Sequence, residues 1–159
     1  MTANKRNTMT LLFAILIGVF FACSDGDDPE VMDESPNESF DGYGGDYVGL
    51  WNSTTEMAVF TDVSISARVN EASEGLLVGD FFISSNFTSC CGSGSSDGSV
   101  TIRLSQDSVT SFRWSDTISG CTGTFTGSGI IQDSARFVID IVGTDCDGDH
   151  VGTIVLNKR

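Results

Sequence analysis

Residues 57–70 read MAVFTDVSISARVN, and the alternation within this stretch decides the fold. Apolar or small side chains recur at every second position, namely Met57, Val59, Thr61, Val63, Ile65, Ala67 and Val69. Successive side chains of a β-strand point to opposite faces. A period of two therefore predicts a strand that is buried on the face carrying these residues.

Seven further stretches have the composition of strands, at residues 47–54, 76–87, 99–104, 109–115, 121–131, 136–143 and 151–157. The connections between them are mostly short and rich in Gly, Asp and Ser, which suits hairpins and leaves no room for crossover helices. We therefore expect an all-β domain over residues 47–159. Eight antiparallel strands in succession close naturally into an up-and-down barrel, because closure removes the exposed edges of a sheet.

The interior of an eight-stranded barrel is either filled by side chains or just wide enough for one small ligand. Glycines at 123, 127 and 129 are typical of bent strands or of room for a ligand. Five large side chains at expected inward positions are the candidate ligand-cavity residues: Trp51, Phe81, Phe112, Trp114 and Phe125.

The first 22 residues have the organisation of an export signal. Lys5 and Arg6 form a positive region, residues 11–21 (LLFAILIGVFF) an apolar run, and Ala22 a small residue before Cys23. This run is too short for a transmembrane helix, which needs roughly 20 residues. The segment resembles a bacterial lipoprotein signal. The resemblance implies that residues 1–22 are removed and that Cys23 carries three acyl chains, which anchor a protein almost permanently.

Residues 23–46 are predicted to form an acidic flexible linker. After Cys23 they contain nine acids, no base and both prolines of the chain. Such a composition cannot bury enough apolar surface to offset the entropy of ordering. The start of this linker resembles the acidic signal that sends some Gram-negative lipoproteins to the outer face of the outer membrane, here Ser24, Asp25, Asp27 and Asp28. The resemblance implies display on the cell surface, and the alternative is a generic acidic linker.

The charge of the chain excludes one class of partner. The formal net charge is −14. All 22 acidic residues lie after Cys23, together with only six of the eight basic residues. Nucleic acids are bound through clustered Lys and Arg, and the sequence has no such cluster, so we expect no nucleic-acid partner. The same sign disfavours an electrostatic membrane contact, which leaves the lipid as the expected anchor.

Four cysteines remain once Cys23 is assigned to lipid, and an even number in an exported domain favours disulfides. The adjacent Cys90 and Cys91 do not have the C-x-x-C spacing of a zinc site, so we expect neither a metal nor another cofactor. These two cysteines are expected to be either joined to each other or left as thiols.

The remaining pair, Cys121 and Cys146, is predicted to form a disulfide across a hairpin. If residues 132–135 form the turn between the strands 121–131 and 136–143, Cys121 faces Cys146 in the same register. This register places Phe125 and Phe137 on opposite faces of the sheet unless a bulge intervenes.

Gly49 and Trp51 form a Gly-x-Trp motif near the start of the first expected strand. This motif resembles the opening motif of lipocalins, eight-stranded barrels that hold small apolar ligands and in which the tryptophan covers the closed end. The resemblance covers three positions, and the later Thr-Asp-Tyr and Arg motifs of the family have no clear counterpart. It implies a lipocalin-like barrel, and the alternative is a core tryptophan preceded by a glycine.

His150 is the only histidine, so a Ser-His-Asp or Cys-His arrangement would have to be built around it. It follows Asp145, Asp147 and Asp149 in the expected turn between the last two strands, which favours a turn residue over a catalytic one. The alternating acids lack the glycine and glutamate positions of an EF-hand calcium loop. We therefore expect no catalytic residue and no metal ligand.

Together these patterns predict a lipid-anchored, surface-exposed envelope lipoprotein with a non-catalytic binding role for a small apolar ligand. The alternative is a protein-interaction module, such as an inhibitor, adhesin or envelope-assembly subunit, that uses the barrel loops. A hollow interior favours the first function, whereas a packed interior moves the function to the loops. Neither functional hypothesis predicts the oligomeric state.

Overall fold

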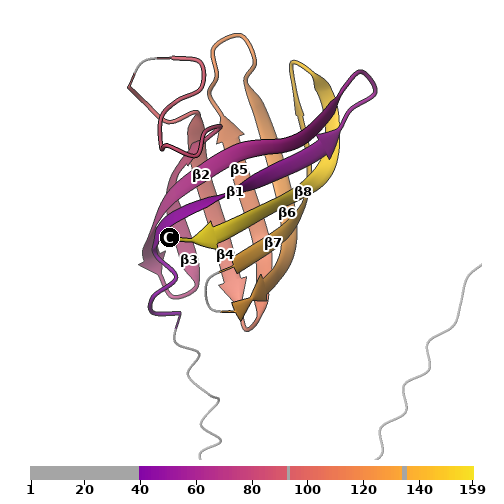
Figure 1. Cartoon of the computed structure of the whole chain (residues 1–159). Coiled ribbons are helices and arrows are strands. Elements are labelled where there is room, and N and C mark those ends of the chain that lie inside the picture. Colours follow the sequence, from indigo (N-terminus) through magenta and orange to yellow (C-terminus); the bar gives the residue numbers. More distant parts are fainter. Residues whose placement is uncertain (1–39, 93, 134–135) are drawn as a thin grey trace, which may run out of the picture. The chain divides into compact units, whose positions relative to one another are not determined.

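The computed structural model describes residues 40–92, 94–133 and 136–159, and these form a closed barrel (Figure 1). Each strand pairs antiparallel with the next, and β1 closes the barrel by pairing with both β2 and β8. The strands are β1 (Gly45–Thr54), β2 (Val59–Ser73), β3 (Leu76–Phe82), β4 (Gly98–Ser105), β5 (Ser108–Asp116), β6 (Gly123–Gln132), β7 (Arg136–Asp145) and β8 (Gly148–Lys158).

The predicted all-β class, the eight strands and the up-and-down order are confirmed. The largest difference in strand length lies in β3, which ends at Phe82 instead of extending to residue 87. The connection to β4 is therefore a long loop over residues 83–97, which lies at one end of the barrel (Figure 1). The other connections are two to six residues long, which suits hairpins.

A bulge in β2 corrects the prediction for residues 57–70. The register of β1 against β2 shifts between Trp51 and Ser53, so that two residues of β2 oppose one of β1. Asp62 lies in this bulge with φ 53°, a conformation that Asp adopts more readily than most residues. The extra residue reverses which face is buried, so Met57 and Val59 are 76% and 73% exposed, whereas the same alternation after the bulge buries Ile65, Ala67 and Val69.

The predicted register between β6 and β7 was wrong by one residue. Ile131 faces Phe137, and Phe125 faces Gly143. This pairing places Phe125 and Phe137 on the same face, and both are fully buried. Burial of two phenylalanines therefore selects the register, because a slip of one residue would turn one strand's apolar face to solvent. The ladder has no bulge here; the irregularity beside the glycines of β6 lies in its pairing with β5.

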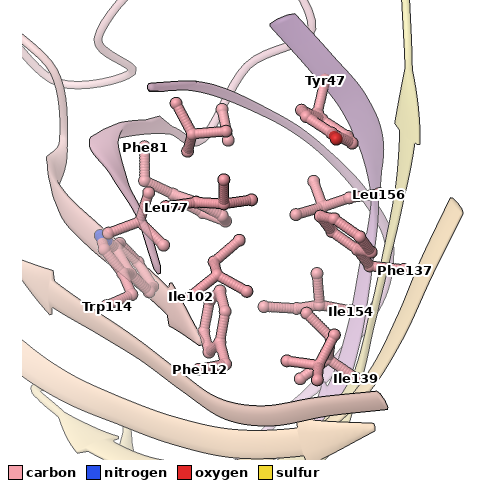
Figure 2. Close-up of a cluster of buried hydrophobic side chains, with 14 of the residues drawn as sticks. Tyr47, Leu77, Phe81, Ile102, Phe112, Trp114, Phe137, Ile139, Ile154 and Leu156 are labelled. Atoms are coloured by element: carbon pink, nitrogen blue, oxygen red, sulfur yellow. The ribbon is translucent and has the colours of Figure 1, made fainter. Parts of the chain in front are cut away.

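The barrel interior is filled by large side chains that point toward one another from opposite walls (Figure 2). All five predicted cavity residues are buried, and Trp114 stacks on Phe125 with ring centroids 4.7 Å apart. The largest fully buried side chains are Trp114, Tyr47, Phe81, Phe112, Phe125, Phe137, Ile65, Leu77, Ile102, Ile139, Ile141 and Ile154. The interior is thus a packed core, one of the two outcomes that an eight-stranded barrel allows.

The end of the barrel at which β1 begins is closed by aromatic side chains. Tyr43 and Tyr47 both stack on Phe137, at centroid distances of 6.1 and 5.1 Å, and the Tyr47 hydroxyl donates to the Tyr43 carbonyl (2.6 Å). Phe40 is buried beside Gly75, whose φ of +65° and lack of a Cβ allow the close approach. Residues 40–46, predicted as linker, therefore belong to the barrel; residues 23–39 lie outside the described residues.

Phe40→Ala is expected to lower the free energy of unfolding by about 3 kcal/mol, because it removes a buried ring that closes the core. Met57→Ala is the matched control, since the Met57 side chain is exposed, and its effect should stay within about 0.5 kcal/mol. Urea denaturation of the chain that begins at residue 24 measures both. Equal losses in the two variants would contradict the assignment of Phe40 to the core.

Candidate binding pocket at the barrel mouth

A pocket of about 240 Å³ lies at the end of the barrel where β1, β3, β5 and β7 finish. We call it the mouth pocket. It lies at the opposite end from the turn between β2 and β3, where Phe40 packs beside Gly75; β1 begins at that far end (Figure 1). Its lining combines apolar, acidic and disulfide-bonded residues: Trp51, Phe60, Val63, Ile83, Cys91, Trp114, Asp116, Ile118, Cys121, Asp145, Asp147 and His150.

The floor of the mouth pocket is an aromatic cluster that continues into the core. Trp51 stands edge-on to Trp114 (5.3 Å, 88°) and to Phe125 (4.9 Å, 76°). Edge-to-face pairs place the positive rim of one ring against the negative face of another, which adds about 0.5–1.5 kcal/mol to burial alone. Both indole N–H groups are buried without a hydrogen-bond partner among the described residues, so the otherwise apolar floor contains two unpaired donors.

His150 connects the floor to the acidic rim. Its ring lies 5.1 Å from that of Phe60 and 5.4 Å from that of Phe125. Nδ1 lies 3.0 Å from the Ser53 hydroxyl, and Nε2 lies 3.0 Å from Asp145 Oδ1. A carboxylate only accepts hydrogen bonds, so Nε2 donates to Asp145, and a neutral ring then accepts the Ser53 proton at Nδ1. The expectation that His150 is a turn residue was wrong: it lies in β8 and is buried.

The Ser53, His150 and Asp145 side chains form a hydrogen-bonded series that sequence reasoning did not anticipate. In a hydrolytic triad the nucleophile must be reachable by substrate. Ser53 is buried and is not among the residues that line the mouth pocket. What the series does in this structure is satisfy a buried imidazole and connect the mouth ends of β1, β7 and β8, since buried polar groups need partners.

Two carboxylates of the rim are held in place by backbone donors. The Ile118 N–H donates to Asp116 Oδ1 (2.7 Å), and the Asp147 N–H donates to Asp145 Oδ1 (2.8 Å). Burial raises the pKa of Asp116 to about 6; the Ile118 hydrogen bond opposes the shift, and the negative charges of Asp145 and Asp97 add to it. The rim therefore concentrates negative charge over an apolar floor.

The loop over residues 83–97 is organised by one buried carboxylate. Asp97 accepts hydrogen bonds from the Ile83 N–H (2.8 Å), the Ser89 hydroxyl (2.7 Å) and the Cys90 N–H (3.0 Å). Cys90 and Cys91 are joined as a vicinal disulfide, one of the two states expected for them. Because Asp97 fixes both ends of this loop, Cys91 and Ile83 are placed in the wall of the mouth pocket.

The predicted pairing of Cys121 with Cys146 agrees with the structure, which places their Cα atoms 4.7 Å apart within a disulfide. Cys121 precedes β6 and Cys146 follows β7, so the pair lies at the rim and not within the β6–β7 ladder. Ligand atoms of these two cysteines, Asp145 and Asp147 all lie within 4.8 Å of one another. Disulfide sulfurs are not the thiolates that bind a metal, which leaves two carboxylates as possible donors.

The structure divides the predicted cavity residues into two groups. Trp51 and Trp114 line the mouth pocket, whereas Phe81, Phe112 and Phe125 are core residues that do not line it. The lipocalin resemblance implies that Trp51 covers the closed end of the barrel. In the structure Trp51 lies at the mouth, and the closed end is covered by the aromatic residues around Tyr47.

Several residues of the mouth pocket were missed because they depend on the bulge or on loops. Phe60 faces inward only because the bulge reverses its side of β2, and no sequence signal marks the bulge except the polar Asp62. Ser53, the partner of His150, follows the same buried alternation as Tyr47 and Trp51 in β1. Ile83 and Ile118 lie in loops, whose course a strand pattern does not predict.

Cys23, Ser24, Asp25, Asp27 and Asp28 lie outside the described residues. Within the described part of the chain, no helix has the length and apolarity needed to cross a membrane. Comparisons with protein-family models, with curated proteins and with solved structures found no match for this chain.

Asp116→Asn is expected to remove a pH dependence of stability. The folded-state pKa of Asp116 lies above the ordinary value of 3.8. The protonated carboxyl group therefore makes its full contribution to stability below pH 3.8. This contribution is lost as the pH rises through about 6. The advantage of wild type over the variant should fall by about 2 kcal/mol between pH 3.5 and 7, because one pKa unit corresponds to about 1.4 kcal/mol and the rim is partly solvated.

Urea denaturation across this pH range measures the difference, with Asp133→Asn as the control for the same change at an exposed position away from the mouth. Parallel pH profiles for wild type and Asp116→Asn would contradict the raised pKa.

Proposed function

We propose that this chain is a non-catalytic binding protein, tethered to the outer membrane by lipid on Cys23 and exposed at the cell surface, which receives a small apolar ligand in the mouth pocket. The observation that carries the proposal is an apolar, aromatic-floored hollow that remains open in a barrel whose interior is otherwise filled. Concave, mostly apolar sites with a few polar groups are the usual form of small-molecule sites.

The packed core limits both the position of the binding site and the size of the ligand. The interior has no room below Trp51 and Trp114, so the ligand does not enter the barrel as it does in a hollow barrel. The pocket, at about 240 Å³, lies slightly below the roughly 300–1,000 Å³ of typical ligand sites. A ligand of one ring, or one ring-sized part of a larger molecule, therefore fits the pocket.

The direction of the barrel supports the tethered part of the proposal. Phe40 lies at the end opposite the mouth pocket, and the C-terminal residue returns to that same end, where the Arg159 N–H donates to the Asp46 carbonyl (2.9 Å). A tether that precedes Phe40 in the chain therefore joins the barrel at the end away from the mouth pocket. Loops at the free end of a rigid scaffold are common places for binding sites.

A row of exposed apolar side chains favours the second candidate, a protein-interaction module such as an inhibitor, adhesin or envelope-assembly subunit. Thr54 of β1 faces both Val59 and Val151, and Val142 of β7 faces Val151. Val142 and Val151 are 54% and 63% exposed on the outside of the barrel. With Val59, which is 73% exposed on the other side of Thr54, they form an apolar surface of the kind that partner proteins cover.

The anchoring is tested by Cys23→Ser. Acylation requires the thiol, so the variant should incorporate no alkyne-tagged fatty acid, whereas wild type should be labelled. As a control, Cys121→Ser removes a disulfide-bonded cysteine outside the signal and should leave the labelling unchanged. Equal labelling of wild type and Cys23→Ser would contradict the lipoprotein assignment.

The binding role is tested by native mass spectrometry of the protein purified from its own host. Wild type should carry a bound small molecule, and Val63→Phe, which fills the mouth pocket, should lose it. Val151→Phe makes a similar change on the outer surface and should retain it. A wild-type native mass equal to that of the lipidated chain alone would contradict the ligand-binding proposal. A partner protein lost from Val151→Asp but not from Val63→Phe would favour the second candidate.

A further inference from the structure

The charge around the mouth pocket is of one sign. Its lining contains Asp116, Asp145 and Asp147, and none of the described residues that line it is Lys or Arg. The single basic side chain there, His150, already donates to Asp145. Charge complementarity therefore points to a ligand that carries a positive charge, because an anion would meet only like charges.

The carboxylates are positioned before any ligand arrives. His150 Nε2 and the Asp147 N–H both bind Asp145 Oδ1, and the Ile118 N–H binds Asp116 Oδ1. Burial raises the pKa of Asp116, and repulsion from the carboxylates of Asp145 and Asp97 adds to the shift. A cation among these groups would relieve the repulsion, which is a gain that a neutral ligand does not obtain.

The apolar part of the pocket suits one ring. Phe60, Val63 and Ile83 line it and remain partly exposed, whereas Trp51 and Trp114 below them are buried. A cavity of about 150 Å³ is enough for benzene in a protein core. The pocket holds about 240 Å³, which leaves space for a short chain beyond a ring. Aromatic side chains in the lining also attract a cation directly.

We propose that the ligand of the mouth pocket is a small aryl-alkyl ammonium ion, with its ring between Phe60, Val63 and Ile83 and its ammonium group beside Asp116 and Asp145. This inference rests on the proposed binding function and adds a positively charged group to the apolar ligand proposed there.

The test uses tryptophan fluorescence of the full chain in phosphatidylcholine vesicles at pH 7.5 and low salt. The chain has two tryptophans, and both line the mouth pocket, so the signal reports this site. Three probes share one ring and one arm length but differ in charge: phenethylammonium, 2-phenylethanol and phenylacetate. Phenethylammonium should bind at least fivefold more tightly than the alcohol, since one charge pair in water at about 4 Å corresponds to about a fivefold change. Phenylacetate should bind more weakly than the alcohol.

Two variants locate the effect. Asp116→Asn removes a charge but keeps an oxygen that accepts from the Ile118 N–H. Asp147→Asn removes a charge from an exposed residue of the rim, where a substitution disturbs the fold least. Each should weaken phenethylammonium binding by about fivefold and leave 2-phenylethanol binding unchanged. Asp133→Asn, the matched control far from the mouth, should bind all three probes as wild type does.

Each other outcome has a defined meaning. If 2-phenylethanol binds as tightly as phenethylammonium, the cation inference is overturned while the proposal of an apolar ligand stands. If Asp133→Asn weakens binding as much as Asp116→Asn, the preference arises from net charge and the inference is also overturned. If none of the probes changes the fluorescence of wild type, both the inference and the small-ligand function fail.

Discussion

The rest of the structure depends on the filling of a narrow barrel by its own aromatic side chains. An eight-stranded barrel has an interior of about the size that side chains can fill. Here Trp51, Trp114 and Phe125 pack edge-to-face and face-to-face across it, and Phe81 continues the cluster 4.8 Å from Trp114. Because this interior is occupied, an apolar ligand has access only to the surface of the cluster, at the open end. The position of the proposed site thus follows from core packing.

The same packing explains the polar groups of the mouth. A histidine placed against Phe60 and Phe125 is removed from water and needs partners for both ring nitrogens. Ser53 and Asp145 supply them at 3.0 Å each. The carboxylate that satisfies His150 therefore lies at the boundary of core and solvent, near Asp116, where it contributes to the negative rim of the pocket. The Asp145 side chain therefore has two roles: it stabilises the buried His150 and it contributes to the proposed recognition of the ligand.

The strands and the topology could be predicted from the sequence because they rest on local patterns, such as the alternation around Ile65 and the short polar turns. The misplaced features depend on long-range choices. The bulge at Asp62 reverses the inward face of β2, and the β6–β7 register follows from the joint burial of Phe125 and Phe137. Phe40 lies within an acidic segment and is buried only because the barrel end is near. The mouth pocket joins residues from five strands and three connections, so no single stretch of sequence indicates it.

The central claim is that the core is filled and that apolar molecules bind only at the mouth. Methyl NMR of the isotopically labelled protein during titration with benzene tests this claim directly, because isoleucines lie in both places. The account predicts shift changes for Ile83 and Ile118, which line the pocket, and none for Ile139 and Ile154, which are fully buried in the core. Saturable changes at Ile139 and Ile154 would show that the barrel admits a ligand into its interior and would contradict the account.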